Sequence, residues 1–175
     1  KEIVTLELIK VLRNAGVSIG VVTSNWGNNE FFRRAHECAN RIVRARIGFI
    51  SITPRWDSIR MTLHQLIYVP SLYFVFESIL RKWKPKHIVH TNWHHLLLLL
   101  PFLRPGRDLF WLHEVIPRRR HYRFVFHCFA RRIGMFVPVS QAVANSLLDL
   151  GIPEAKITVV RNGIADPFSP ARKPS

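Results

Sequence analysis

The stretch that most constrains the fold covers residues 136–168, where two kinds of pattern alternate. Phe136–Val139 is a short apolar run, which is typical of a buried parallel strand. Ser140 stands where a helix N-cap is expected, and small or apolar residues then recur at helical spacing until Gly151. Ile157–Val160 is a second short apolar run, read as another buried strand. A strand, a helix and a strand in succession predict a parallel sheet.

The same alternation extends through the rest of the chain. Apolar residues at helical spacing predict helices over Glu2–Ala15, Glu30–Arg44, residues 57–83 with a kink at Pro70, Trp93–Leu103 and His121–Ile133. Short apolar runs predict strands over Val17–Thr23, Arg46–Ile52, His87–Thr91 and Asp108–Val115. We therefore expect an α/β fold with a Rossmann-like parallel sheet flanked by helices.

Composition limits the classes of function. The chain has 175 residues, which is enough for one domain with a core, and 48% of them are hydrophobic. The 26 Lys and Arg residues against 11 Asp and Glu residues leave a net charge of +15, so an anionic partner is expected. Cys38 and Cys128 are predicted to be free thiols. We find no signal peptide and no uncharged apolar run of the roughly 18 residues that a spanning helix needs.

Several short motifs occur in one order along the chain. They read Lys84-Pro85 followed by Ile88-Val89-His90, then Val139-Ser140, Gly151-Ile152-Pro153, Lys156-Ile157-Thr158-Val159 and Asn162-Gly163-Ile164. Together they resemble the N-terminal domain of the retaining glycosyltransferases of family 4, which have the two-domain GT-B fold. One departure is Ala165, which stands where that family has Asp, with Asp166 one place later.

The resemblance implies a domain organisation. Residues 1–166 would form the acceptor-side Rossmann-like domain of a GT-B fold, and residues 167–175 a truncated interdomain linker. The family's first strand and glycine-rich turn would precede Lys1, so the sheet would lack its first strand. The second GT-B domain, which holds the nucleotide, would also lie outside this chain, and the fragment alone would be inactive. A nucleotide sugar would serve as the donor substrate, with no cofactor and no metal expected.

Candidate site residues follow the predicted strands, since ligands of parallel sheets bind beyond the carboxyl ends of strands. In the resembling family, a histidine at the position of His113 contacts the donor sugar and supports the transition state; the alternative is an ordinary loop histidine. A metal site at His90, His94 and His95 is disfavoured, because His90 is on a strand and no Cys lies nearby. Core packing of Trp93 remains the alternative to a cleft role. The remaining candidates for the acceptor and donor cleft are Asn92, Trp93, His94, Glu114, Ser140, Asn162 and Gly163.

A basic and aromatic segment begins after the strand predicted over Asp108–Val115. Its arginines surround four aromatic residues, a pattern typical of a helix at an anionic membrane surface. An ordinary helix whose aromatic residues face the core and whose arginines are solvated would look the same. The aromatic residues are Tyr122, Phe124, Phe126 and Phe129. We expect a cytoplasmic enzyme, peripheral on the inner face of the membrane, acting on a glycan or lipid-linked acceptor. The alternative is a non-catalytic basic module that binds anionic membrane or nucleic acid; a nucleic acid partner is not expected, since no such motif is present. The predicted membrane-contact residues are Arg118, Arg119, Arg120 and Arg123.

Overall fold

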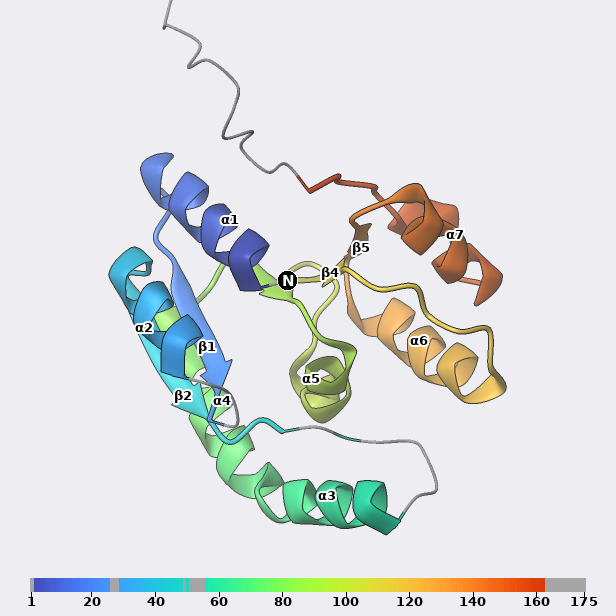
Figure 1. Ribbon diagram of the computed structural model, residues 1–175, viewed down its shortest axis with the longest axis horizontal. Coiled ribbons are helices and arrows are strands. Elements are labelled where there is room, and N and C mark those ends of the chain that lie inside the picture. The colour runs from blue at the N-terminus through green and yellow to red at the C-terminus, as the bar shows by residue number, and fades with distance from the viewer. Residues whose placement is uncertain (1, 26–28, 49, 51–55, 163–175) are drawn as a thin grey trace, which may run out of the picture.

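The computed structural model describes residues 2–25, 29–48, 50 and 56–162, and its strands and helices alternate along the chain (Figure 1). The strands are β1 (Gly20–Ser24), β2 (Arg41–Ala45), β3 (Ile88–His90), β4 (Asp108–Leu112) and β5 (Met135–Pro138). The α-helices are α1 (Glu2–Asn14), α2 (Asn29–Cys38), α3 (Trp56–Ile67), α4 (Val69–Trp83), α5 (Trp93–Leu98), α6 (Arg120–Arg132) and α7 (Gln141–Asp149). Two 3-10 turns, η1 (Leu100–Phe102) and η2 (Glu154–Lys156), complete the described elements.

All described strand pairs are parallel, which confirms the predicted α/β class with a Rossmann-like sheet. The strands form two sheets, one of order β1-β2 and one of order β3-β4-β5. Among the described residues, β1 and β3 are not hydrogen-bonded to each other.

The first sheet packs against α4. In Figure 1, α1 and α2 lie in front of the β1–β2 pair and α4 passes behind it. Ala45 and Ile47 pack there with Leu72 and Phe76 of α4. The ring of Phe102 in η1 contacts the ring of Phe76 edge-on, with centroids 5.5 Å apart. This contact joins the core of the first sheet to the segment that follows β3, so the two sheets are connected through packed side chains.

The second sheet carries the larger core. Fully buried aromatic side chains fill it from β4, β5 and α6, and a cluster of this size is the main source of stability for such a domain. Helices α5, α6 and α7 contribute the other side chains of the cluster. The fully buried aromatic residues are Phe110, Phe126, Phe129 and Phe136.

The helix predicted over Glu30–Arg44 is wrong in its second half. Helix α2 ends at Cys38, and Arg41–Ala45 is the strand β2, which pairs in register with β1. The Asn40 side chain accepts a hydrogen bond of 2.8 Å from the Ile19 backbone N–H, which fixes the turn that redirects the chain. The strand expected over Arg46–Ile52 therefore lies earlier, although residues 49, 51 and 52 are outside the described part of the chain.

The long helix predicted over residues 57–83 is interrupted near the expected proline. Helices α3 and α4 meet at a bend of 51° at Tyr68. Pro70 lies in the first turn of α4, where its missing N–H costs no helical hydrogen bond. Within the described residues no single helix is long and apolar enough to cross a membrane, and only α3 and α4 taken together as a bent pair satisfy that test.

The apolar run Ile157–Val160 was predicted to be a buried strand, and this is correct only in part. Thr158 and Val160 donate backbone hydrogen bonds of 3.0 Å to Phe136 and Pro138 of β5, so the segment runs parallel to that strand. Only Ile157 forms a bridge, however, and Thr158, Val159 and Val160 are exposed. Apolarity correctly predicted the pairing but not the burial, because no described element covers the outer side of this segment.

Candidate active site

The carboxyl ends of β3, β4 and β5 meet at one edge of the second sheet, since the three strands are parallel. His90 pairs with Phe110, and Leu112 pairs with Pro138, so the strands end close together. The segments that leave this edge begin at Thr91, His113 and Val139. Parallel sheets bind ligands at this edge, and most of the predicted cleft residues follow these strands.

Asn92 and Trp93 have structural roles in the segment after β3. The Asn92 side chain accepts a hydrogen bond of 3.0 Å from the His94 backbone N–H and so caps α5. Trp93 is buried in the main core and contacts Tyr122 of α6 edge-on, with ring centroids 5.7 Å apart. The structure therefore supports the alternative of core packing for Trp93. His94 is also buried, and its ring lies 3.6 Å from the Trp93 ring centroid.

His113 is the first residue after β4 and is half-buried, whereas Glu114 beside it is exposed. The His113 ring lies 4.5 Å from the ring of Trp111, measured between centroids. Two hydrogen bonds hold the loop that follows: the Ile116 N–H donates to Ser146 Oγ at 3.2 Å, and that hydroxyl donates to the Val143 carbonyl at 2.7 Å. A side chain that is partly accessible and held by packing beside a fixed loop is suited to contacting a ligand.

Ser140 begins α7 as predicted, in extended backbone, and its hydroxyl accepts from the Val143 N–H at 3.4 Å. The Val139 N–H donates to the Leu112 carbonyl at 3.1 Å, so the segments after β4 and β5 leave the sheet side by side. Asn162 is exposed beyond the last described contact with β5. Gly163 lies outside the described residues.

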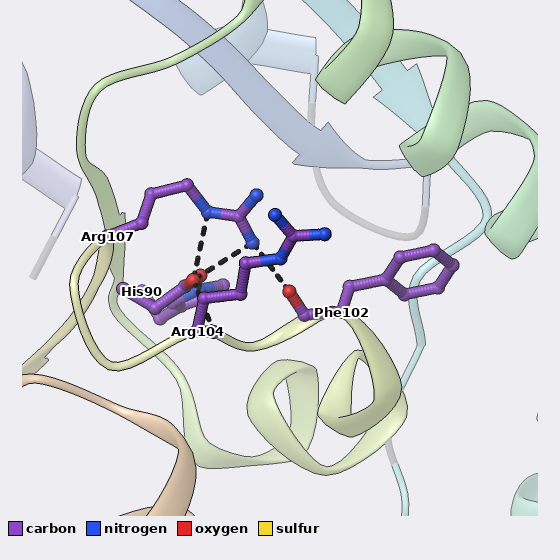
Figure 2. A network of polar contacts seen from close by, with 5 residues as sticks. His90, Phe102, Arg104 and Arg107 are labelled. Atoms are coloured by element: carbon purple, nitrogen blue, oxygen red, sulfur yellow. Dashed lines mark hydrogen bonds and ion pairs between the residues drawn. The ribbon is translucent and has the colours of Figure 1, made fainter.

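A buried polar network that the motifs did not reveal lies at the start of β4 (Figure 2). Asp108 is fully buried, and its Oδ1 lies 2.7 Å from His90 Nε2. Asp108 Oδ2 accepts from the Arg104 backbone N–H at 2.9 Å and from Arg107 Nε at 3.0 Å. Arg107 also donates to the Phe102 carbonyl. The network ties the turn before β4 to β3, which gives His90 a structural partner away from the cleft edge.

The charge of Asp108 depends on this network. Burial by itself raises the pKa of the carboxyl group, but the hydrogen bonds from His90 and from the Arg104 backbone, with the positive charge of Arg107, hold it below its ordinary value of 3.8. The carboxylate is therefore ionised at neutral pH. Among the described residues, no group of three or more His, Cys, Asp or Glu side chains has the arrangement of a metal site.

Two surface hollows lie away from the carboxyl edge of the second sheet. One, of about 430 Å³, lies between α2 and β2 and is lined by Phe32, His36 and Arg44 among others. The other, of about 500 Å³, lies at the opposite edge of the second sheet and is lined mainly by Lys84, Lys86, Arg104 and Arg107. Neither of these two hollows includes His113.

The comparison with known proteins adds to this geometry. The model of Glycosyltransferase Family 4 matches residues 2–166. The chain belongs to Glycosyltransferase Family 4. No curated protein matches it. As a family 4 domain, it has a glycosyltransferase-type function, and its parallel sheets flanked by helices agree with the Rossmann-like half of a GT-B fold.

The predicted membrane-contact arginines of this family 4 domain lie just before α6 and in its first turn. Arg118, Arg119, Arg120 and Arg123 are all exposed, and so is Phe124 on the same helix. Phe126 and Phe129 of the same helix are not exposed, because they belong to the core. The spacing in the sequence did not by itself separate the exposed Phe124 from the buried Phe126 and Phe129. The tertiary contacts decided which of them face solvent.

Proposed function

We propose that this domain forms the acceptor side of a retaining enzyme that transfers a sugar from a nucleotide-sugar donor to a glycan or lipid-linked acceptor. Residues 1–166 constitute the acceptor domain in this proposal, and a second GT-B domain supplies the nucleotide site. The position of His113 carries the argument. It is half-buried at the first position after β4, beside the segment after β5, at the edge where parallel sheets bind ligands.

The chemistry of glycosyl transfer explains why an imidazole is useful there. The transferred sugar passes through a state with oxocarbenium character while the diphosphate leaves with negative charge. A fixed ring N–H can donate to a sugar hydroxyl or to the leaving group, and this interaction strengthens as charge develops. Glu114 is adjacent and exposed, so it can face the acceptor. The proposed chemistry uses no metal and no cofactor. It involves only the sugar donor, the acceptor and side chains of the protein.

The test is the substitution His113→Ala in the full-length enzyme, assayed against a panel of nucleotide sugars. We expect turnover to fall by about 100-fold or more, on the scale of losing one transition-state contact. His87→Ala is the matched control, because His87 is exposed just before the amino end of β3, whereas the candidate site lies at the carboxyl ends of the strands. Turnover that is equal in the His113 variant and the wild type would remove His113 from the mechanism. Retention is tested separately, by the anomeric configuration of the product.

We also propose that the arginines at the start of α6 hold the enzyme at an anionic membrane surface on the cytoplasmic side. Their exposure, with Phe124 among them and a net charge of +15, supports this role. Binding to vesicles should require anionic lipid and weaken as salt is added. The alternative of a non-catalytic basic module would gain support if no nucleotide sugar were consumed while vesicle or nucleic acid binding persisted.

A further inference from the structure

Helix α3 turns its apolar side toward solvent, which is the reverse of what a helix in a packed domain does. At 100° per residue, five large apolar side chains share an arc of about 100° on this helix. They are strongly exposed: Trp56 is 86% exposed, Ile67 is 72% and Leu63 is 58%. In Figure 1, α3 forms the lower border of the molecule. The five residues of the arc are Trp56, Ile59, Leu63, Leu66 and Ile67, and we call them the α3 apolar face.

The opposite side of α3 holds the helix to the domain. Gln65 is its one buried residue, and the Gln65 side-chain amide donates to the Arg46 carbonyl at 3.0 Å. Just beyond the helix, the Arg46 guanidinium lies 4.6 Å from the ring centroid of Tyr68. These polar contacts attach one side of α3 to the segment that follows β2, although Met61 near that side is 52% exposed. The outward direction of the α3 apolar face agrees with this attachment on the other side.

The chemistry of the surface around this face selects its partner. The helix begins with a tryptophan, an amphipathic side chain that favours a membrane interface. Arg60 borders the apolar arc on one side, His64 and the acidic Asp57 follow further round the helix, and the chain as a whole carries a net charge of +15. In Figure 1, the first turns of α3 and α6 both lie toward the lower right of the molecule, and Arg120 and Arg123 in the first turn of α6 are exposed. An apolar strip on a chain with this excess of positive charge is complementary to an anionic bilayer.

Length decides how the helix would contact a bilayer. Its 12 residues extend about 18 Å, which is too short for the roughly 30 Å of a hydrocarbon core. We propose that the α3 apolar face inserts into the headgroup and acyl boundary of an anionic membrane, with the helix axis in the plane of the surface. This goes beyond the transferase reaction and beyond the electrostatic contact proposed for α6. It names a second, apolar element that enters the lipid.

The experiment measures binding of the full-length protein to vesicles of equal parts phosphatidylcholine and phosphatidylglycerol. Leu63→Ser and Ile67→Ser should each weaken binding by about tenfold, the loss expected for one branched aliphatic side chain that no longer enters the lipid. Val11→Ser is the matched control, because Val11 is 62% exposed on α1, away from α3, and this change should leave binding as it is. High salt should weaken binding without abolishing it, since insertion is not screened.

A second measurement follows the depth of Trp56. Brominated lipids should quench the fluorescence of the bound wild type, and Trp56→Phe should remove most of that quenching. This variant also covers the case in which a serine substitution disturbs folding, since an exposed aromatic is replaced by another. The transferase assay without vesicles is independent of all these results, so failure here does not touch the proposed reaction.

Three outcomes would overturn the proposal. The first is equal binding of wild type, Leu63→Ser and Ile67→Ser to the vesicles. The second is vesicle binding without quenching of Trp56. The third is a dimer in solution that Leu63→Ser dissociates, because the α3 apolar face would then be covered by a second copy of the chain.

Discussion

The buried carboxylate of Asp108 offers a quantitative test of the fold. Asp108→Ala removes the acceptor of three donors at once, from His90, Arg104 and Arg107. Asp108→Asn is gentler. Its amide oxygen can take the place of Oδ2 and keep the two arginine donors, while its NH₂ group faces His90 Nε2, which accepts in the other neutral tautomer.

The expected magnitudes follow from these contacts. Removing one partner of a buried, hydrogen-bonded charge pair costs about 3–5 kcal/mol, so we expect that loss for Asp108→Ala. Asp108→Asn retains the bonds but loses their ionic component, and about 1–2 kcal/mol is expected. For a chain of this size, each kcal/mol lowers the melting temperature by roughly 2–4 °C. The alanine variant should therefore melt about 10 °C below the wild type.

The direction of the pKa shift of Asp108 determines how the free energy of unfolding changes with pH. Because the pKa of Asp108 is below its ordinary value of 3.8 in the folded protein, its contribution is complete above that value. It is lost as the pH falls through the lowered folded pKa. The wild type should thus approach Asp108→Asn in stability under acid conditions, while the two differ at neutral pH.

Thermal or urea unfolding at pH 7 and near pH 3 measures both effects. A gap between wild type and Asp108→Asn that is the same at both pH values would refute the ionic account. An alanine variant as stable as the wild type would refute the view that the network of Figure 2 holds the turn before β4.

Two further predictions concern close contacts in the second sheet. A Cβ on Gly134 would clash with the Pro105 carbonyl oxygen, so Gly134→Ala should cost about 1–3 kcal/mol in the free energy of unfolding, whereas Gly106→Ala, with open space around it, is the control. Equal melting temperatures for the two glycine variants would contradict this. The Lys156 ammonium donates to the Ala130 and Ile133 carbonyls at the end of α6, so Lys156→Met should cost roughly 1–2 kcal/mol in urea unfolding. The exposed Lys86→Met is its control, and a loss no larger than that of the control would show that the carbonyls do not depend on Lys156.

The sequence predicted where most candidate site residues lie relative to the strands, but not which groups they contact. His113 was expected at the end of the strand predicted over Asp108–Val115, and Ser140 directly after the strand predicted over Phe136–Val139. In the structure His113 is the first residue after β4, which ends at Leu112, and Ser140 is the second after β5, so the apolar runs located the strand ends to within a few residues. Whether His113 contacts a sugar stays a prediction. Asp108 was missed, because one acidic residue at the start of a strand carries no pattern that indicates a buried partner 18 residues earlier in the sequence.

Element boundaries failed where a local pattern was ambiguous. The segment Arg41–Ala45 continued an apparent helix in sequence, yet it is β2, because parallel pairing with β1 satisfies its backbone groups. Helix stops succeeded where the residue type itself decides. Gly16 and Gly151 both have positive φ after a helix, a conformation that glycine adopts without a steric cost.

The sequence by itself determined the alternation of helices and parallel strands, the family, and the positions at which polar side chains follow strands. These depend on local periodicity and on residue types with narrow conformational preferences. Only the tertiary structure decided which apolar faces are covered. The α3 apolar face and the core face of α6 have the same kind of spacing in sequence, but Phe126 is buried by β4 and β5 while Leu63 meets solvent. Burial is a property of neighbours brought together from distant parts of the chain, and periodicity along one helix does not contain it.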